Sequence, residues 1–300
     1  HYPLRRQRQM CIRDSIKPSF GDPPAPGGMK QIIVGGYNDA LSNAAVEYNA
    51  ISGGYQWATV ANNAKQVVST PGMLRNLFVE LSAAPGSGTS YILMVLKNGT
   101  DTPLRVTISD AATTGSNHEG IVSVVAGDII QLCSSYNGSP STTPTARWSV
   151  EFWGSNTKES LILGLGQCIN AATVYHPICH ANPSGGTTNQ YQYQIIPTPG
   201  TIKNLYVALS ADPGNSPDAY RFTLRKNGTS TTLTLTITAD NTTGNNTTNQ
   251  ISLVAGDYVD LMIENLNSPL ASPVAWWGMT FVADTNGESL ILGQSYDPPN

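Results

Sequence analysis

The chain has 300 residues, of which 40% are hydrophobic, enough to form the cores of two domains. Only 12% of the residues are charged, against about 25% in ordinary soluble domains, and Thr, Ser, Asn and Gly replace the missing charges. Such a surface is typical of secreted, cell-surface or virion proteins. The net charge of −4 provides no basic patch for nucleic acid, and the absence of an apolar run of about 18 residues excludes a membrane-spanning helix.

The first 15 residues, HYPLRRQRQMCIRDS, differ in composition from the rest of the chain and contain four arginines and Cys11. The run RQRQMCIRDS resembles the translated sequencing adaptor found at the ends of genes predicted from environmental DNA. With the Pro- and Gly-rich GDPPAPGG that follows, it predicts a non-native or disordered leader over residues 1–28. A basic targeting arm is the alternative interpretation of this segment.

The rest of the chain repeats itself at a spacing of 129 residues. Three segments return at this spacing: KNGT at 97–100 and 226–229, AGD at 126–128 and 255–257, and ESLILG at 159–164 and 288–293. A period of this length is that of a whole domain and not of a short solenoid unit. The sequence therefore predicts two tandem domains, 29–158 and 159–288, followed over 289–300 by the start of a truncated third repeat or by a terminal strand.

Each repeat contains a series of short predicted β-strands. Within 76–81, and again within 204–209, apolar residues alternate with others, which is the pattern of a half-buried strand. Asn98-Gly99 and Asn227-Gly228 directly follow such strands and favour tight type I′ hairpins. Because short strands recur at roughly ten-residue spacing, we predict an all-β protein made of two β-sandwich domains related by an internal duplication.

The order of these segments resembles the jelly roll of the tumour-necrosis-factor and complement-head type. The likeness lies in a strand ending in KNG, a Thr-rich strand, a strand ending in AGD and a closing strand around Trp148 or Trp277. The succession of LSAAPG, LRKNG, AGD and RW more closely resembles modules of bacteriophage and environmental-virus fibre or virion-surface proteins. This resemblance implies jelly-roll-like domains, a structural or adhesive role, and a homo-oligomeric assembly such as a trimer.

No catalytic constellation is shared by the two repeats. The chain contains no G-x-S-x-G, P-loop or His-Glu-x-x-His motif. Asp128 and Asp257 recur, but each follows a glycine in a tight turn, where an Asp side chain commonly caps backbone amides. We therefore expect no enzymatic activity, no catalytic residues and no cofactor.

One cluster carries the ligand chemistry of zinc, namely Cys168, His176, Cys179 and His180. It lacks the paired spacing of a zinc knuckle, and the adjacent Cys179 and His180 would point to opposite faces of a strand. Three alternatives remain open: two buried free thiols, which behave as small apolar core residues, a disulfide between the cysteines, or a zinc site. We expect no tightly bound metal.

Two tryptophans occupy the predicted outer face of the closing strands. Trp148 shares the predicted core face with Val150 and Phe152, and Trp277 shares it with Met279 and Phe281, whereas Trp153 and Trp276 fall on the opposite face. Exposed tryptophan is a common stacking platform and is enriched at interfaces. Trp153 and Trp276 are therefore candidates for interface packing, for glycan stacking, or for partial cover by a loop.

The strand before the first Asn-Gly turn differs from its twin on the outer face. Ile92, Met94 and Leu96 take the places of Arg221, Thr223 and Arg225. A contiguous apolar patch on a surface usually marks an interface. We expect the second domain or another subunit to cover Ile92, Met94 and Leu96.

These observations predict a non-enzymatic structural or receptor-binding component of a virus particle, such as a fibre or virion-surface module, located on a virion or outside the cell. Its expected partners are other virion proteins or its own copies, and cell-surface glycans, with no nucleic acid or membrane. A secreted or cell-surface bacterial array of carbohydrate-binding modules is the alternative. A fragment of an enzyme that carries its catalytic domain elsewhere is a third interpretation.

Overall fold

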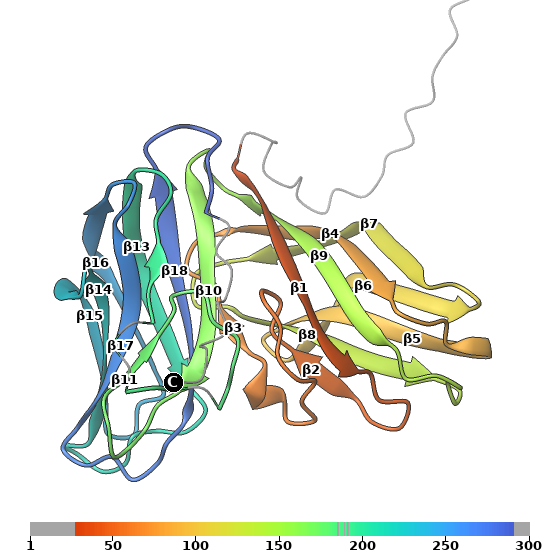
Figure 1. Ribbon diagram of the computed structural model, residues 1–300, viewed down its shortest axis with the longest axis horizontal. Helices are drawn as coiled ribbons and strands as arrows, with labels where there is room; N and C mark the ends of the chain where they lie inside the picture. The colour runs from red at the N-terminus through yellow and green to blue at the C-terminus, as the bar shows by residue number, and fades with distance from the viewer. Residues whose placement is uncertain (1–27, 185, 189, 191, 291–300) are drawn as a thin grey trace, which may run out of the picture.

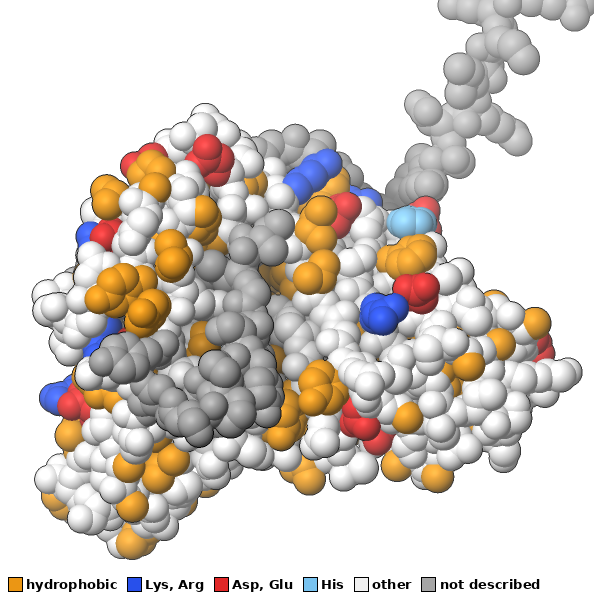
Figure 2. Space-filling model, viewed as in Figure 1, with side chains coloured by type: hydrophobic (Ala, Val, Ile, Leu, Met, Phe, Trp, Pro, Cys, Tyr) orange, Lys and Arg blue, Asp and Glu red, His pale blue; other side chains and the backbone are white. Residues whose placement is uncertain are grey.

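The computed structural model describes residues 28–290 except 185, 189 and 191. It confirms the predicted all-β fold: the described residues form eighteen strands and one short 3-10 helix, and the strands pair into four antiparallel sheets. Most of the predicted leader and the last ten residues lie outside the described residues. Charged side chains are sparse on the face shown in Figure 2, as the composition requires.

The first domain is a sandwich of two sheets (Figure 1). One sheet has the order β1-β9-β4-β7 and the other has the order β2-β8-β5-β6, with β3 paired to β8. Eight strands in this arrangement form a jelly roll. The elements are β1 (Lys30–Ala40), β2 (Glu47–Asn49), η1 (Ala61–Asn63), β3 (Gln66–Val67), β4 (Gly72–Leu81), β5 (Gly86–Lys97), β6 (Thr100–Asp110), β7 (Thr114–Val124), β8 (Ile129–Asn137) and β9 (Thr145–Gly154).

The second domain repeats this arrangement strand for strand. Its sheets have the orders β10-β18-β13-β16 and β11-β17-β14-β15, with β12 paired to β17. The internal duplication therefore extends from the sequence to the topology. The strands are β10 (Glu159–Gln167), β11 (Val174–His176), β12 (Gln194–Ile195), β13 (Gly200–Leu209), β14 (Ala219–Lys226), β15 (Thr229–Thr238), β16 (Thr243–Leu253), β17 (Tyr258–Leu266) and β18 (Val274–Ala283).

Local sequence explains the strands and the tight turns. In β4 the apolar positions of the alternating pattern are buried, while Phe78 and Glu80 are exposed. Asn98 and Gly99 have φ values of +52° and +76°, as a type I′ turn requires of both central residues. Asparagine and glycine tolerate this conformation best, so the Asn-Gly pair fixes the β5–β6 hairpin.

Each domain has its own hydrophobic core, and each core contains one tryptophan of the closing strand, Trp148 or Trp277. Trp148 in the first domain donates its indole N–H to the carbonyl oxygen of Ile51 at 2.9 Å, and Trp277 in the second does the same to Ile178 at 2.7 Å. Both side chains are buried among the inward-facing aliphatic residues of two sheets. Satisfying the indole N–H allows such a large ring to be buried without an unpaired donor.

The two cores meet through β10. Alternate residues of this strand point to opposite sides, so Ile162 packs in the core of the second domain, while Leu161 and Leu163 pack in the core of the first. Figure 1 shows β10 at the boundary between the two sandwiches, with β3 of the first domain facing it. The second domain thus begins with a strand that is buried against its predecessor.

Polar contacts fix the geometry of this junction. The side-chain amide of Gln31 donates to the carbonyl oxygen of Leu161 and accepts from its backbone N–H, both at 2.8 Å. Glu159 accepts a hydrogen bond from the hydroxyl of Thr70 and forms an ion pair with Lys203 at 2.7 Å. Because buried apolar side chains and satisfied polar groups combine here, the domains form one unit.

Among the described residues, no helix is long and apolar enough to cross a membrane.

Candidate functional site

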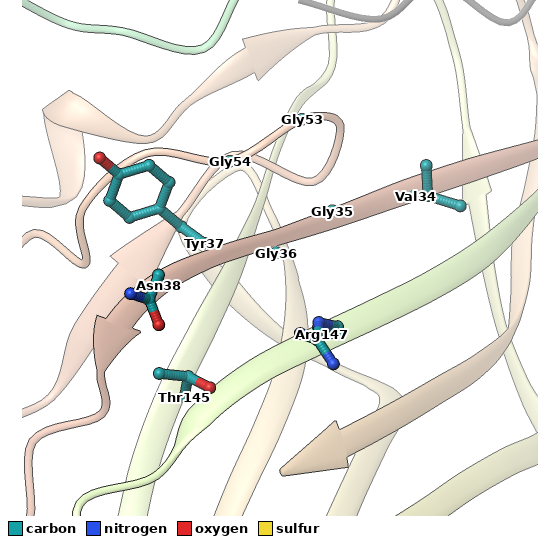
Figure 3. A pocket seen from close by; sticks show the side chains of 9 residues that line it. All are labelled: Val34, Gly35, Gly36, Tyr37, Asn38, Gly53, Gly54, Thr145 and Arg147. Carbon is teal, nitrogen blue, oxygen red and sulfur yellow. The ribbon is translucent and has the colours of Figure 1, made fainter. Parts of the chain in front are cut away.

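A groove of about 610 Å³ lies on the first domain beside β1, a size within the range of about 300–1,000 Å³ typical of small-ligand sites. Figure 3 shows its walls: Val34, Tyr37 and Asn38 come from β1, Thr145 and Arg147 come from β9, and Gly53 and Gly54 form a turn beside β1. The floor is glycine backbone. A ligand can therefore approach the main chain closely along this part of the strand.

Backbone contacts hold the turn of the groove against β1. The N–H of Gly36 donates to the carbonyl oxygen of Gly53 at 3.2 Å, and the N–H of Gly53 donates to Val34 at 2.9 Å. A side chain at position 54 would place its Cβ 2.2 Å from the carbonyl oxygen of Gly36. Only glycine at position 54 allows this approach, so the shape of the groove depends on it.

In the second domain, larger apolar side chains occupy the positions that correspond to those of the groove. In β10 and β18, Leu165 and Trp276 are register partners, as Gly36 and Arg147 are in β1 and β9. Ala181 takes the place of Gly54 beside the strand. Leu165, Ala181 and Trp276 are all buried at the junction with the first domain. The same part of the sheet is therefore an exposed groove in the first domain and a buried contact with the first domain in the second.

The rim of the groove combines an aromatic ring with hydrogen-bonding side chains. Tyr37 is exposed, and its ring lies 6.1 Å from that of Tyr55. The Arg147 side chain is mostly exposed and makes only a long 3.9 Å contact with Glu80. With the amide of Asn38 and the hydroxyl of Thr145, these groups suit a ligand with a flat apolar face and several hydroxyls. The residues that line the groove include no Asp, Glu, His or Cys.

The sequence did not single out these groove residues, although one signal was present. Aligning the repeats pairs Gly36, Thr145 and Arg147 with Leu165, Val274 and Trp276. Each pair exchanges an apolar side chain for a small or polar one. Because the three positions lie close together only in the folded sheet, the exchange becomes a groove only in three dimensions.

The recurring aspartates cap turns, as their place after glycine predicted. Asp128 accepts from the backbone N–H of Val125 and from the Asn98 side chain, both at 2.8 Å. Asp257 makes the same contacts with Val254 and Asn227. The hydrogen bond from the Val254 backbone, with those from Lys226 and Asn227, lowers the pKa of Asp257. A carboxylate stabilised in its charged form by turn contacts is a structural cap.

In the cysteine and histidine cluster, Cys168 and His176 are buried, whereas Cys179 and His180 are half-buried. Among the described residues, no three of the His, Cys, Asp and Glu side chains come together in a way that could hold a metal ion. Cys168 and Cys179 are free thiols, so the disulfide alternative is not realised in the structure. The rings of His176 and His180 lie 5.2 Å apart, and His176 also contacts Trp277 at 5.4 Å. Burial lowers the pKa of both histidines, to about 3 for His176 and about 4 for His180.

Trp276 lies in the junction between the domains. Its indole N–H donates to the carbonyl oxygen of Asn62 at 2.9 Å, and the ammonium group of Lys65 lies 4.9 Å from its ring centroid. Of the three candidate roles for Trp276, interface packing is the one that agrees with its position, because the ring packs between the two domains of the same chain. The buried ring is not available for glycan stacking.

Trp153 is half-buried on the outer face of β9. Lys30 and Arg75 place their cationic groups 4.2 Å and 4.3 Å from its ring centroid, and its indole N–H donates to Glu151 at 2.6 Å. These contacts come from β1, β4 and β9 of its own domain. Lys30 and Arg75 both contact the ring by cation–π attraction, so the ring of Trp153 is partly covered by side chains of its own domain.

The apolar side chains Ile92, Met94 and Leu96 of β5 point away from the core, as predicted, but they are covered by residues of their own domain. Tyr91, Leu93 and Val95 enter the core, which places Ile92, Met94 and Leu96 on the opposite face. We expected a neighbour to cover this face. Instead, Met94 and Leu96 are already buried in a small cluster with Cys133 and Tyr48 of the same domain, and Ile92 is half-buried. Side chains of β2, β5 and β8 shield one another because they lie on adjacent strands, which corrects the expectation for Met94 and Leu96.

No protein-family model and no curated protein matches this chain. Among solved structures, the chain is similar to a xanthan lyase from Paenibacillus, with 14% sequence identity and a TM-score of 0.24. The alignment covers 89% of this chain and 27% of the lyase. A likeness of this extent identifies no family and carries no argument about activity.

Proposed function

We propose that this protein is a non-enzymatic structural and receptor-binding component of a virus particle, such as a fibre or virion-surface module, located on the virion or outside the cell. One observation carries the proposal: two identical folds are locked together through β10, and one of them leaves the corresponding surface open as a groove. A rigid pair of domains presenting a shallow binding groove suits display and attachment. The virion setting itself rests on the sequence resemblance.

The binding part of this proposal is assigned to the groove, and its ligand class to cell-surface glycans. A sugar has an apolar ring face that can lie on Tyr37, and hydroxyls that Asn38 and Arg147 can bind. Because the surface of the groove is open and small, we expect it to hold one or two sugar units. Such sites bind weakly, and several copies on one particle would raise the avidity.

The test is binding of the purified chain to a glycan array and to intact host cells. Tyr37→Ala and Arg147→Ala are expected to abolish binding, because they remove the ring and the cation of the groove. Arg105→Ala is the matched control, since Arg105 is also exposed but lies on β6, away from the groove. Binding that is lost equally in Arg105→Ala, or retained in both groove variants, would reject the groove as the receptor site.

A secreted bacterial carbohydrate-binding array is the second candidate function, favoured by the same aromatic and polar rim. The two functions differ in what they recognise. A carbohydrate-binding array should bind a purified polysaccharide in the absence of cells, whereas a receptor-binding module should lose binding when the host lacks one surface glycan. Gene neighbourhood adds an independent criterion, because tail, baseplate or capsid genes would favour the virion.

A further inference from the structure

The chain contains four Asn-Gly pairs, at 98–99, 137–138, 227–228 and 286–287. In such a pair the backbone nitrogen of the glycine can attack the side-chain carbonyl carbon of the asparagine before it, because glycine has no Cβ to obstruct the approach. The attack is intramolecular, so its rate depends on how closely the chain holds the two groups together. The four pairs share this chemistry, and the structure gives them different environments.

Two of the pairs are held in their hairpins by the aspartates that cap the neighbouring turns. The side-chain nitrogen of Asn98 donates to Asp128 at 2.8 Å, and its side-chain oxygen accepts from the backbone N–H of Ile129 at 2.8 Å. Asn227 makes the equivalent two contacts in the second domain, at 2.7 Å and 2.9 Å. Neither side-chain amide can therefore turn toward its glycine without breaking two hydrogen bonds.

Asn137 has the opposite environment. It is exposed at the end of β8, and its side-chain oxygen accepts a hydrogen bond from the backbone N–H of Gly138 at 3.1 Å. The side-chain carbonyl group thus already lies beside the nitrogen that would attack it. Within the part of the chain that the structure describes, the side-chain nitrogen of Asn137 has no hydrogen-bond partner. The attacking atom is close, and the group that would leave is unrestrained.

The fourth pair, Asn286-Gly287, is intermediate between these two environments. Asn286 is exposed, and its side-chain oxygen accepts a long 3.4 Å hydrogen bond from the hydroxyl of Thr157. The backbone N–H of Gly287 donates to the carbonyl oxygen of Thr157 at 3.3 Å. The side chain is thus loosely held, but the attacking nitrogen is engaged with another residue.

We propose that Asn137 is a site of spontaneous deamidation, and that the turn contacts of Asn98 and Asn227 protect them from the same reaction. The Gly138 nitrogen forms a bond to Cγ of Asn137 while the bond from Cγ to the side-chain nitrogen breaks. The proton of the glycine amide leaves with that nitrogen as ammonia. Water then opens the cyclic imide at either carbonyl, which gives aspartate or isoaspartate. Water is the co-reactant, and nothing is oxidised or reduced.

The modification belongs to the first domain, because the second domain carries a different residue at this place. Asn137 pairs with Ser90, and the corresponding register pair of the second domain is Leu266 with Ala219. This inference does not rest on the proposed function. It follows from the contacts that distinguish one Asn-Gly pair from the others.

The reaction changes the end of β8 and leaves the sandwich intact. A carboxyl group replaces a neutral amide, so each conversion adds one negative charge at neutral pH. Isoaspartate also adds a methylene group to the main chain. Because Asn137 forms the last register pair of β8 with β5, the remaining pairs of this ladder persist. The chain is therefore expected to gain charge at Asn137 with age while it stays folded.

The test is peptide mapping by mass spectrometry of the purified full chain, incubated at mildly alkaline pH in water enriched in heavy oxygen. Opening of the imide incorporates one solvent oxygen, which marks conversion during the incubation. Asn137 is expected to convert at least about tenfold faster than Asn98 and Asn227, because those two must first lose two hydrogen bonds. Asn286 is expected to convert at an intermediate rate.

The same incubation in urea is the matched control. Unfolding removes the turn contacts but leaves each asparagine in the same Asn-Gly dipeptide. The four sites should then convert at similar rates, so a difference that exists only in the folded chain is due to the structure.

Two substitutions test the two environments separately. Asn137→Gln should abolish conversion at this position, since the longer side chain would have to close a larger ring. Asp128→Ala should speed the conversion of Asn98, whose side-chain nitrogen loses its acceptor, and leave Asn227 unchanged because Asp257 still holds it. Near-UV circular dichroism verifies that each variant is folded.

Three results would overturn the proposal. Conversion of Asn98 or Asn227 as fast as that of Asn137 in the folded chain shows that the turn contacts give no protection. An Asn137 that stays intact in the folded chain but converts in urea shows that its environment does not favour the attack. Rates that differ in urea as much as in the folded chain assign the difference to the neighbouring sequence.

Discussion

Gly278 of the second domain lies directly against the backbone of Val67 in the first. A Cβ atom at position 278 would lie 2.0 Å from the carbonyl oxygen of Val67, far inside contact distance. The absence of a side chain at this one position therefore sets how closely the two domains approach.

The first prediction concerns this contact. Gly278→Ala should lower the free energy of unfolding by about 1–3 kcal/mol, because the added methyl group overpacks against backbone that cannot move aside cheaply. Urea denaturation is the measurement. Ser149→Ala at the same register position of the first domain is the control, and its stability should change little since that face is uncovered. Equal effects of the two substitutions would show that the junction is not tightly packed.

The second prediction compares the two outer-face tryptophans. Trp276→Ala should lower the free energy of unfolding by about 3–5 kcal/mol, because it removes a buried ring and leaves the carbonyl of Asn62 without its donor. Trp153→Ala should have a clearly smaller effect, since Trp153 is only half-buried. Thermal unfolding of both variants provides the test, and a larger loss in Trp153→Ala would contradict the assigned environments.

The third prediction transplants an ion pair between the domains. Arg225 and Asp260 form a buried bidentate pair, and their register counterparts in the first domain are Leu96 and Gln131. Leu96→Arg alone should destabilise by about 3–5 kcal/mol, because it places an unpaired charge in a buried position. Adding Gln131→Asp should recover part of this loss.

A double-mutant cycle in urea measures the recovery. Gln131→Asp alone is the necessary third variant. If Gln131→Asp does not improve the stability of Leu96→Arg, the outer faces of the two domains differ in more than these two side chains.

The fourth prediction concerns acid. Burial lowers the pKa of His176 and His180 below the ordinary value of 6.5, so between this value and about pH 3–4 the unfolded chain binds more protons than the folded one. The free energy of unfolding should therefore fall as the pH drops below 6.5, by up to about 1.4 kcal/mol per pH unit for each histidine. Below the folded pKa values this contribution should level off.

The pH dependence of the melting temperature between pH 7 and pH 4 is the measurement. His176→Asn should flatten it, because the first domain carries Asn49 at the corresponding position and buries it with hydrogen bonds. His118→Asn is the control, since His118 is exposed on β7. An unchanged slope in His176→Asn would mean that other groups cause the acid sensitivity.

Local patterns in the sequence determined most of the fold. The duplication, the alternating strands and the Asn-Gly hairpins depend on residues a few positions apart, or on direct comparison of the two repeats. Period-two alternation reports which side of a strand faces its own core, so the inward orientation of Leu93 and the outward orientation of Met94 were both predictable. Even the capping by Asp128 followed from its place after a glycine.

Only the tertiary structure decided whether the outward-facing side chains of the strands are buried or exposed. Ile32 and Leu161 are both apolar and occupy the same register position, yet the first is exposed and the second is buried. Met94 is shielded by Tyr48, whereas Trp276 is covered by another domain. The physical reason is that burial of an outer face depends on contacts between residues far apart in the chain. The alternation of a strand contains no information about which neighbour, if any, will pack against that face.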